Sequence, residues 1–420
     1  MAMSTSRKHT SQLTVLVLTV FLDMLGVSLV IPVAAPLFLG PDGGIFGPLV
    51  PLDYRTLILG FLLGTAPIVQ FFSAPLLGAY ADRAGRKPVL TLSVLATGLG
   101  HVLFGMGILS QQIWLLFVSR ALAGAGAGNI SAANSAMADV SDDTSKVRNF
   151  GLIGMAIGLG LIFGPYLGGQ LSDPSVAPWF TYATPLWIAA GLSALNALVI
   201  QLFFRETLVQ AISGDMDVLT GVRNIVRAFT MPTMRTMYLV SLLFGFGYNF
   251  FTQFFSVFLI ARFQFSSSEI GVLFAYVGLW IALSQGLLAR FLSRLVRPST
   301  VVHWAPLATA AVLLVLAGVH KVHTVYLLLP AVAAFYGLNS PNVTALISDL
   351  ADRQSQGEAL GINQSMSALS FGIPPIIAGI VSTVNVALPM ILAAVFMLVA
   401  WFIFVRFHYQ RTRPLFHEVE

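Results

Sequence analysis

Charged and titratable side chains that lie inside long apolar runs are the residues of this sequence that could carry proton chemistry. Asp23 stands near the middle of the first run, His101 in the third and Arg120 in the fourth. A charge in an apolar span is costly, so such residues pair or line water-filled pathways. Burial favours the neutral form of a carboxyl group and a nearby arginine favours the charged form, so the two effects together can poise it to exchange a proton. We therefore predict Asp23 and Arg120 as proton-coupling residues, with His101 as a further titratable candidate; a structural ion pair is the alternative for Arg120, and simple packing for His101.

A charged loop between the second and third apolar runs carries the next pattern. It reads Gly, three residues, Asp-Arg, one residue, Gly-Arg-Lys, at Gly78, Asp82, Arg83, Gly85, Arg86 and Lys87. Span 11 begins near Gly357 on the same side of the membrane, and a helix N-terminus carries partial positive charge that attracts a carboxylate. We predict that Asp82 and Arg86 form a conformational latch. For Arg83 and Lys87, the positions also fit simple anchoring at the membrane surface.

The elements that position these residues are membrane helices. Hydrophobic residues make up 57% of the 420 positions and charged residues only 9%, whereas a soluble domain has about 25% charged residues. The absence of cysteine excludes disulfides, thiolate metal sites and thiol nucleophiles. The sequence contains twelve apolar runs of about 20 residues, which is the length needed to cross the hydrocarbon core. They cover 13–38, 57–80, 88–110, 112–138, 150–171, 183–204, 236–261, 270–290, 299–319, 323–347, 358–381 and 384–405. We predict an all-α polytopic membrane protein with twelve transmembrane helices, whose first run is too long for a cleaved signal peptide.

The distribution of Lys and Arg fixes the predicted orientation. With the N-terminus in the cytoplasm, eighteen of the 22 basic residues face inward, three face outward and Arg120 lies within a span. Cytoplasmic loops carry the excess of Lys and Arg in membrane proteins. This rule places both termini in the cytoplasm and explains the net charge of +5 without a nucleic-acid partner.

Internal repetition divides the chain into two halves, as is common in transporters. A shift of 210 residues superposes identical residues of spans 4 and 5 on those of spans 10 and 11: Asn129 on Asn339, Asp139 on Asp349, Pro165 on Pro375 and Gly169 on Gly379. We predict six-helix bundles over 1–205 and 235–420. The linker 206–234 between them is cytoplasmic and contains an amphipathic segment suited to the membrane interface.

A glycine-rich sequence ends the fifth apolar run. Residues 158–169 contain five glycines and one proline, and the pattern rests on Gly158, Gly164, Pro165, Gly168 and Gly169. Glycines allow a neighbouring backbone to approach closely, and proline bends a helix. The alternative is that both residue types are simply frequent in membrane helices.

These patterns resemble the major facilitator superfamily. The charged loop fills every place of the family's hallmark loop between helices 2 and 3, and the 158–169 sequence resembles the motif of its drug/proton antiporter branch. The surroundings of Asp23 resemble the first helix of tetracycline-efflux relatives, and Arg120 to Gly124 resembles the family's span 4 motif. The resemblance implies two six-helix bundles that rock around a midplane cavity. Those relatives carry further membrane acids in spans 3 and 9, which this sequence lacks.

One face of the seventh run combines aromatic and amide side chains. Phe246, Asn249 and Gln253 are spaced i, i+3 and i+7. A polar lining in spans 10 and 11 is extended by Asn339, Asn342, Asn363 and Gln364. Such a wall suits a partly apolar, hydrogen-bonding molecule; packing or lipid-facing aromatic surface is the alternative. The wall has no cluster of basic residues, which disfavours organic phosphates and dicarboxylates, although Arg120 alone could bind one carboxylate.

We therefore expect a secondary active transporter of the cytoplasmic (inner) membrane, monomeric in the lipid bilayer. The resemblance implies export of a small amphipathic organic compound in exchange for a proton. The alternative is proton-coupled import of a metabolite, a peptide-like compound or a siderophore. Motifs of intramembrane enzymes are missing, so we predict no catalytic residue, cofactor or metal. The presence of Asp23, Arg120 and Asp82 argues against a receptor that has lost transport.

Overall fold

The computed structural model describes residues 2–40, 44–127, 129–142, 145–208, 219–231, 234–292, 294–351 and 356–412. Every regular element within these ranges is a helix. The first part of the chain forms α1 (Ala2–Ser28), α2 (Ile31–Leu39), the short 3₁₀ turn η1 (Gly44–Phe46), α3 (Leu52–Ala84), α4 (Arg86–Leu109), α5 (Ile113–Gly126), α6 (Asn129–Asp139), α7 (Lys146–Ser172) and α8 (Thr184–Phe203). The second part forms α9 (Thr220–Thr230), α10 (Arg235–Phe263), α11 (Ser267–Leu283), the π-helical turn η2 (Ser284–Leu288), α12 (Ala289–Leu292), α13 (Pro298–Ala317), α14 (Val322–Leu350), α15 (Gln356–Ser382) and α16 (Leu388–Thr412).

Twelve helical stretches of the described chain are long and apolar enough to cross a membrane. Each overlaps one of the twelve predicted runs, and the ends differ by at most five residues. Helices are expected here because an α-helix satisfies all of its backbone hydrogen bonds internally, which a hydrocarbon environment demands. The predicted all-α polytopic fold with twelve transmembrane helices is confirmed.

Three of these spans are built from more than one helical piece. The first span consists of α1 and α2, and the break precedes Pro32, which lacks the backbone N–H that would continue the ladder. The fourth span consists of α5 and α6, and the eighth contains the five-residue π-helical turn η2. Asp23 lies shortly before the break in span 1, and Asn129 is the first residue of α6 in span 4.

The chain forms two compact units. Unit 1 contains Met1–Thr220 and Leu259–Gly278, and unit 2 contains Gly221–Phe258 and Leu279–Glu420. The end of α10 and the first part of α11 therefore pack with unit 1. The division into bundles at the linker 206–234 stays a prediction, and residues 209–218 of that linker lie outside the described residues.

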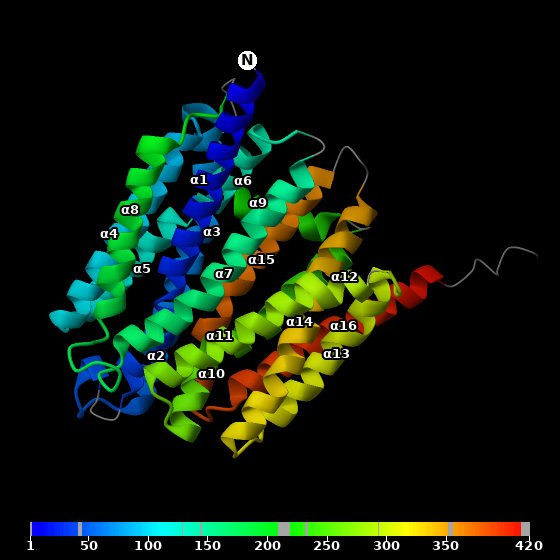
Figure 1. Cartoon of the computed structure of the whole chain (residues 1–420). Helices are drawn as coiled ribbons and strands as arrows, with labels where there is room; N and C mark the ends of the chain where they lie inside the picture. The colour runs from blue at the N-terminus through cyan, green and yellow to red at the C-terminus, as the bar shows by residue number, and fades with distance from the viewer. Residues whose placement is uncertain are drawn as a thin grey trace, which may run out of the picture. The chain divides into compact units, whose positions relative to one another are not determined.

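In unit 1, α1 packs against α7 and α8, and α4 packs against α5 and α8 (Figure 1). Its main core is apolar and is formed by side chains such as Leu16, Val89, Ala133, Ile153 and Ile200. This packing places α1, which carries Asp23, between α7 and α8.

In unit 2, α13 packs against α14 and α16, and α10 contributes Tyr238 to a core with Met366 and Phe404. The amphipathic helix α9 buries Ala228 against this core and exposes Val226 and Phe229. Its location at the membrane interface stays a prediction.

Candidate functional site

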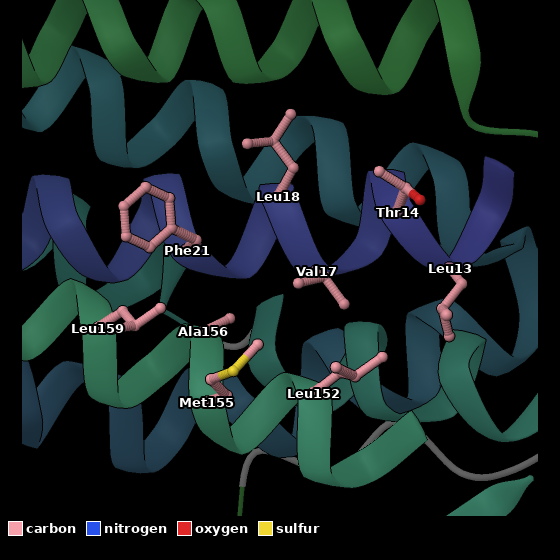
Figure 2. Close-up of a pocket in the computed structure, with 9 residues that line it drawn as sticks. All are labelled: Leu13, Thr14, Val17, Leu18, Phe21, Leu152, Met155, Ala156 and Leu159. Atoms are coloured by element: carbon pink, nitrogen blue, oxygen red, sulfur yellow. The ribbon is translucent and has the colours of Figure 1, made fainter. Parts of the chain in front are cut away.

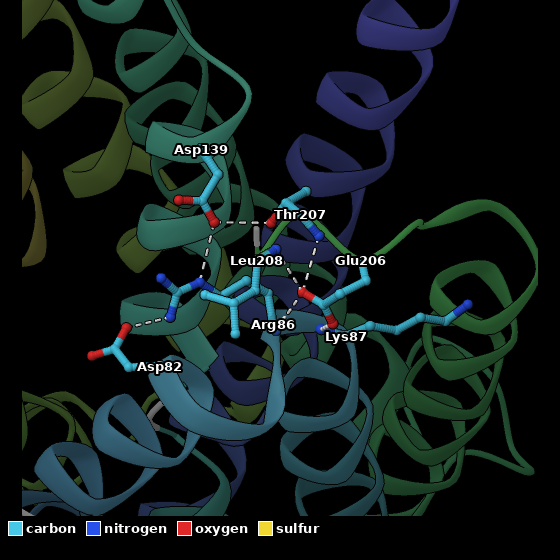
Figure 3. A network of polar contacts seen from close by, with 7 residues as sticks. All are labelled: Asp82, Arg86, Lys87, Asp139, Glu206, Thr207 and Leu208. Atoms are coloured by element: carbon cyan, nitrogen blue, oxygen red, sulfur yellow. Dashed lines mark hydrogen bonds and ion pairs between the residues drawn. The ribbon is translucent and has the colours of Figure 1, made fainter. Parts of the chain in front are cut away.

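A network of charged and backbone groups holds the loop between α3 and α4 (Figure 3). The Arg86 guanidinium is buried and donates to two carboxylates: Nη1 to Oδ1 of Asp82 at 2.5 Å, and Nε to Oδ2 of Asp139 at 3.2 Å. A planar guanidinium can hold two carboxylates in fixed directions, which a lysine ammonium does not. The structure thus brings Asp82 and Arg86 together and adds Asp139 from the end of α6.

Glu206, three residues beyond the end of α8, binds the other side of this loop (Figure 3). Its Oε1 accepts the backbone N–H of Arg86 at 2.8 Å and its Oε2 accepts that of Lys87 at 3.0 Å, at the N-terminus of α4. Oε1 also accepts the N–H groups of Thr207 and Leu208. Burial raises the pKa of the Glu206 carboxyl, but these four N–H groups lower it, and the net pKa lies below its usual value. The carboxylate satisfies helix N–H groups that have no acceptor within the helix.

Gly85 is required by this arrangement. Its φ is +105°, and a Cβ added there would collide with the Glu206 carboxylate, with Cδ at 2.7 Å. A residue with a side chain is disfavoured at such a φ in any case. Lys87 Nζ donates to the Gln201 carbonyl at 2.8 Å, and Arg83 is exposed. The motif glycine thus makes room for a carboxylate from the end of α8.

The titratable residues inside the spans of unit 1 are deeply buried. Asp23 is 6% exposed, and the side chain of Asn129, at the start of α6, lies beside its carboxyl group. His101 is fully buried, neither of its ring nitrogens has a hydrogen-bond partner among the described residues, and its ring packs near Gly26 of α1. The structure describes both Asp23 and Arg120 and places no ion pair between them.

Arg120 is a buried cation without a carboxylate partner in the described chain. Its guanidinium lies 5.0 Å from the centre of the Phe104 ring, an arrangement that stabilises a cation. Its Nε has no hydrogen-bond partner, and its charge acts on the neighbouring His101. Arg120 and His101 therefore form one buried polar cluster, and Asp23 with Asn129 forms another.

The glycines of α7 have two different surroundings. Gly160, Gly164 and Gly168 lie against α1, where added Cβ atoms would collide with Met24, Ser28 and Leu29 respectively. Ser28 Oγ donates to the Gly160 carbonyl at 2.9 Å and links the two helices. Of the predicted motif, Gly164 and Gly168 therefore serve the close contact of α7 with α1.

The other members of that motif lie elsewhere. Gly169 meets Gly271 of α11 within unit 1, and a Cβ on Gly271 would collide with the Pro165 carbonyl. An added Cβ on Gly158 meets no atom within 4 Å. Close helix packing thus accounts for the glycines at 164, 168 and 169 but not for the one at 158.

A small polar pocket of about 60 Å³ lies in unit 2 between α10, α14 and α15. Asn249 lines it, donates to the Gly245 carbonyl at 2.9 Å, and has a buried Oδ1 without a partner. Asn363 accepts from Ser241 at 2.7 Å, and Tyr336, stacked on Tyr248, forms part of the wall. The lining is uncharged and offers amide, hydroxyl and aromatic groups.

The remaining predicted cavity residues do not line this pocket. Phe246 packs edge to face on Phe396 of α16, and Gln253 is partly buried on α10. Asn342 donates to the Leu338 carbonyl of its own helix, and Gln364 is exposed. Asn339 is fully buried, and both atoms of its amide lack partners. The pocket described in unit 2 thus contains two of the seven predicted cavity residues, Asn249 and Asn363.

Sequence reasoning missed Glu206 as a partner of the loop and Asn129 as the partner of Asp23. Glu206 could have been noticed as an acid that directly follows a span end where basic residues prevail. Asn129 and Asp139 were visible as repeat positions, which mark them as special but do not name their contacts. No sequence signal distinguishes Asn249 from Gln253 on the same helical face.

The profile of the Major Facilitator Superfamily matches residues 16–373, with a second match over 237–418. Multidrug resistance protein 1 of Bacillus subtilis (strain 168) is 27% identical over 390 residues, which cover 92% of this chain and 94% of that protein. The class H tetracycline resistance protein of Pasteurella multocida is 28% identical over 418 residues, which cover 95% and 97%. The crystal structure of the human organic anion transporter MFSD10 (TETRAN) superposes with a TM-score of 0.68 at 23% identity, covering 94% of this chain and 99% of that one.

Proposed function

Because this chain belongs to the Major Facilitator Superfamily, we propose that it exports a small amphipathic organic compound in exchange for protons. It is a multi-pass membrane transporter and not an enzyme. Relatives that match over nine-tenths of its length confer resistance to several drugs or to tetracycline, which supports efflux. The observation that carries the proposal is the buried carboxyl group of Asp23 in the first span, which lies beside the Asn129 amide and forms no ion pair with an arginine of the described chain.

The proton site in this proposal is Asp23. A carboxyl group surrounded by apolar spans favours its neutral form, while a donated hydrogen bond favours its charged form. Asn129 belongs to α6 and Asp23 to α1, so a relative movement of these helices changes the balance between the two forms. A ligand shifts a conformational equilibrium only if it binds the two conformations with different affinity. A proton affinity of Asp23 that differs between the inward and outward states would therefore couple proton movement to alternating access.

The substrate wall in this proposal includes the pocket of unit 2. Its amides, hydroxyls and aromatic rings suit a molecule with both apolar surface and hydrogen-bonding groups. Arg120 supplies a cation in unit 1 that no carboxylate of the described chain neutralises. A substrate with a single carboxylate is therefore compatible with the protein.

The proposal also covers the setting of the protein. We infer that both termini lie in the cytoplasm, on the basis of the Lys and Arg distribution, and we propose a monomer in the inner membrane. Asp82 and Arg86 would then lie on the cytoplasmic side, where the latch predicted from the sequence would act.

The experiment uses Asp23→Asn, which fixes the neutral form, in everted vesicles and proteoliposomes with an imposed pH gradient. The panel of compounds includes tetracycline and a quinolone. We expect the wild type to accumulate a compound in acid-loaded everted vesicles, and Asp23→Asn to exchange it without accumulation and without proton flux. The control is Asp53→Asn, an exposed carboxylate in the first turn of α3. If Asp23→Asn accumulates the compound against its gradient with ordinary pH dependence, the proton site lies elsewhere and His101 is the next position to test. If the wild type accumulates the compound only in vesicles of the opposite orientation, the protein is an importer.

A further inference from the structure

The helices α1 and α7 pack closely at Gly160 and leave a groove beside their contact over the preceding residues. Next to Gly160, a Cβ would lie 2.6 Å from Met24 Cβ and 2.9 Å from the Leu25 nitrogen, so the two backbones nearly touch there. Before these positions the helices enclose a groove of about 330 Å³. Figure 2 shows Leu13 near Leu152 at one end of it and Phe21 near Leu159 at the other.

The groove is apolar apart from Thr14 at one end. Its lining comes entirely from α1 and α7: Leu13, Thr14, Val17, Leu18, Phe21, Leu152, Met155, Ala156 and Leu159 (Figure 2). Leu18, Met155 and Leu159 are exposed at 38%, 52% and 38%. At 1.5 Å per residue, Leu13 to Phe21 spans roughly 12 Å along the helix axis. The groove therefore has the elongated shape of a hydrocarbon chain.

The groove opens on the outer face of unit 1. Leu18 and Leu16 are two residues apart on α1 and point in nearly opposite directions, at roughly 100° per residue. Leu16 is fully buried in the core that α1 shares with α6, whereas Leu18 is exposed. Asp23 meets Asn129 on the α6 side as well. The open face of the groove thus points away from the proton site, toward the surroundings that a membrane supplies.

A cation stands at the end of the groove where both helices begin. Arg148 is exposed in the first turn of α7 and precedes Leu152, Met155 and Leu159 by four, seven and eleven residues, so all four share one helical face. The described chain gives Arg148 no ion pair. The N-terminus of α7 adds partial positive charge at this end, and no acidic side chain lines the groove.

We propose that this groove binds a phospholipid with an anionic headgroup, with an acyl chain between α1 and α7 and the phosphate at Arg148. The apolar groove matches the acyl chain of such a lipid, and the cation beside a helix N-terminus at its end matches the phosphate. Basic positions at the membrane surface attract anionic headgroups. With the inferred orientation, the lipid comes from the cytoplasmic leaflet. The site is independent of the transported compound and of the coupling ion.

The test measures phospholipid retained by the purified full-length protein, by native mass spectrometry after mild delipidation from a mixture of phosphatidylglycerol and phosphatidylethanolamine. Arg148→Gln should lower retention of phosphatidylglycerol about fivefold and leave phosphatidylethanolamine unchanged. Met155→Trp, which fills the groove from an exposed position, should lower retention of both lipids. Matched controls are Arg297→Gln, an exposed arginine at the start of α13, and Phe163→Trp, an exposed position of α7 outside the groove.

Retention equal to the wild type in both groove variants would overturn the proposal, provided that their thermal unfolding is unchanged. An equal loss in Arg297→Gln would also overturn it, because the effect would then be general surface charge. Displacement of phosphatidylglycerol by a transported compound, or by formation of a dimer, would assign the groove to that occupant instead. Selective loss in Arg148→Gln and Met155→Trp, with both controls intact, supports the lipid.

Discussion

Glu206 occupies the space that a side chain on Gly85 would need. Its carboxylate accepts the two N–H groups that begin α4, and a Cβ on Gly85 would collide with it. The glycine of the charged loop is thus explained by a residue about 120 positions later in the chain. The end of α8 and the start of α4 depend on each other.

The first prediction concerns Gly85→Ala. The substitution forces a side chain onto a backbone with φ of +105° and pushes it into the Glu206 carboxylate. A left-handed conformation costs about 1–2 kcal/mol for a residue with a side chain. The control, Gly47→Ala, has φ of +79° and no atom within 4 Å of the added carbon. Thermal unfolding in detergent should show a larger decrease in unfolding temperature for Gly85→Ala than for Gly47→Ala. Equal decreases would mean that Glu206 moves aside without loss of stability.

The second prediction is a pH dependence that originates from Glu206. Because its pKa is lowered in the folded protein by the N–H groups, its stabilising contribution is complete above the usual value of 4.5 and is lost as the pH falls through the lowered pKa. The difference in unfolding temperature between wild type and Glu206→Gln should be constant from about pH 6 to pH 8 and shrink below about pH 4.5. The exposed Asp53→Asn is the control. A difference that grows on acidification would contradict the sign.

The third prediction separates two glycines of one motif. Gly164→Ala should destabilise the protein by about 1–3 kcal/mol, because its Cβ would meet Ser28 Oγ and lie 2.9 Å from the Leu25 carbonyl oxygen. Gly158→Ala should be neutral or stabilise by about 0.5–1 kcal/mol, since it meets no neighbour and alanine favours the helix. Chemical and thermal unfolding of both variants provide the measurement. If Gly158→Ala instead keeps its stability and loses transport, this glycine serves movement rather than packing.

The fourth prediction concerns the latch. In Asp82→Asn, Arg86 keeps its bond to Asp139, so the loop should remain folded. We expect near-normal substrate affinity, slower exchange and greater cytoplasmic accessibility of labels placed near Gly361. Asp139→Asn is the comparison, because it removes the less exposed partner of Arg86 and should destabilise the loop more. Unchanged labelling together with unchanged transport would refute a latch at Asp82.

The fifth prediction tests the pocket of unit 2. Asn249→Ala should change the affinity for transported compounds about five- to tenfold and alter which ones are handled, because a lost hydrogen bond leaves a partner unsatisfied. Gln253→Ala tests the second amide predicted on this face. Binding assays on purified protein give the readout. Wild-type affinity for every compound in both variants would remove this face of α10 from the site.

The sequence was sufficient to predict the twelve spans, because a membrane span is defined by length and apolarity, which need no knowledge of neighbours. The rotation of each helix about its axis, in contrast, depends on neighbouring helices and does not follow from length and apolarity. The 158–169 sequence identifies a packing segment, yet only coordinates separate Gly164, which faces α1, from Gly158, which faces no neighbour. Phe246 and Asn249 share a helical face by spacing, but Phe246 packs against α16 and Asn249 lines the pocket.

Contacts between distant segments were beyond prediction for a related reason. The fourth span contains Arg120 and Asn129, and either could have met Asp23. In the structure Asn129 lies beside Asp23, whereas Arg120 lies over Phe104 on another element. From the sequence, Arg120 is the expected partner of Asp23 because their charges are opposite. In the structure the neighbour of Asp23 is the uncharged Asn129.

The contact of α1 with α7 has a mechanical consequence for Asp23. Met24 and Leu25, the two residues that follow it, lie against the backbone at Gly160, and Ser28 is bonded to the same carbonyl. This contact ties the second half of α1 to α7. Asn129 belongs to α6 and takes no part in the contact. If Asp23 is the proton site proposed above, a displacement of α1 together with α7 past α6 would change the distance between Asp23 and Asn129, and with it the affinity of the carboxyl group for a proton.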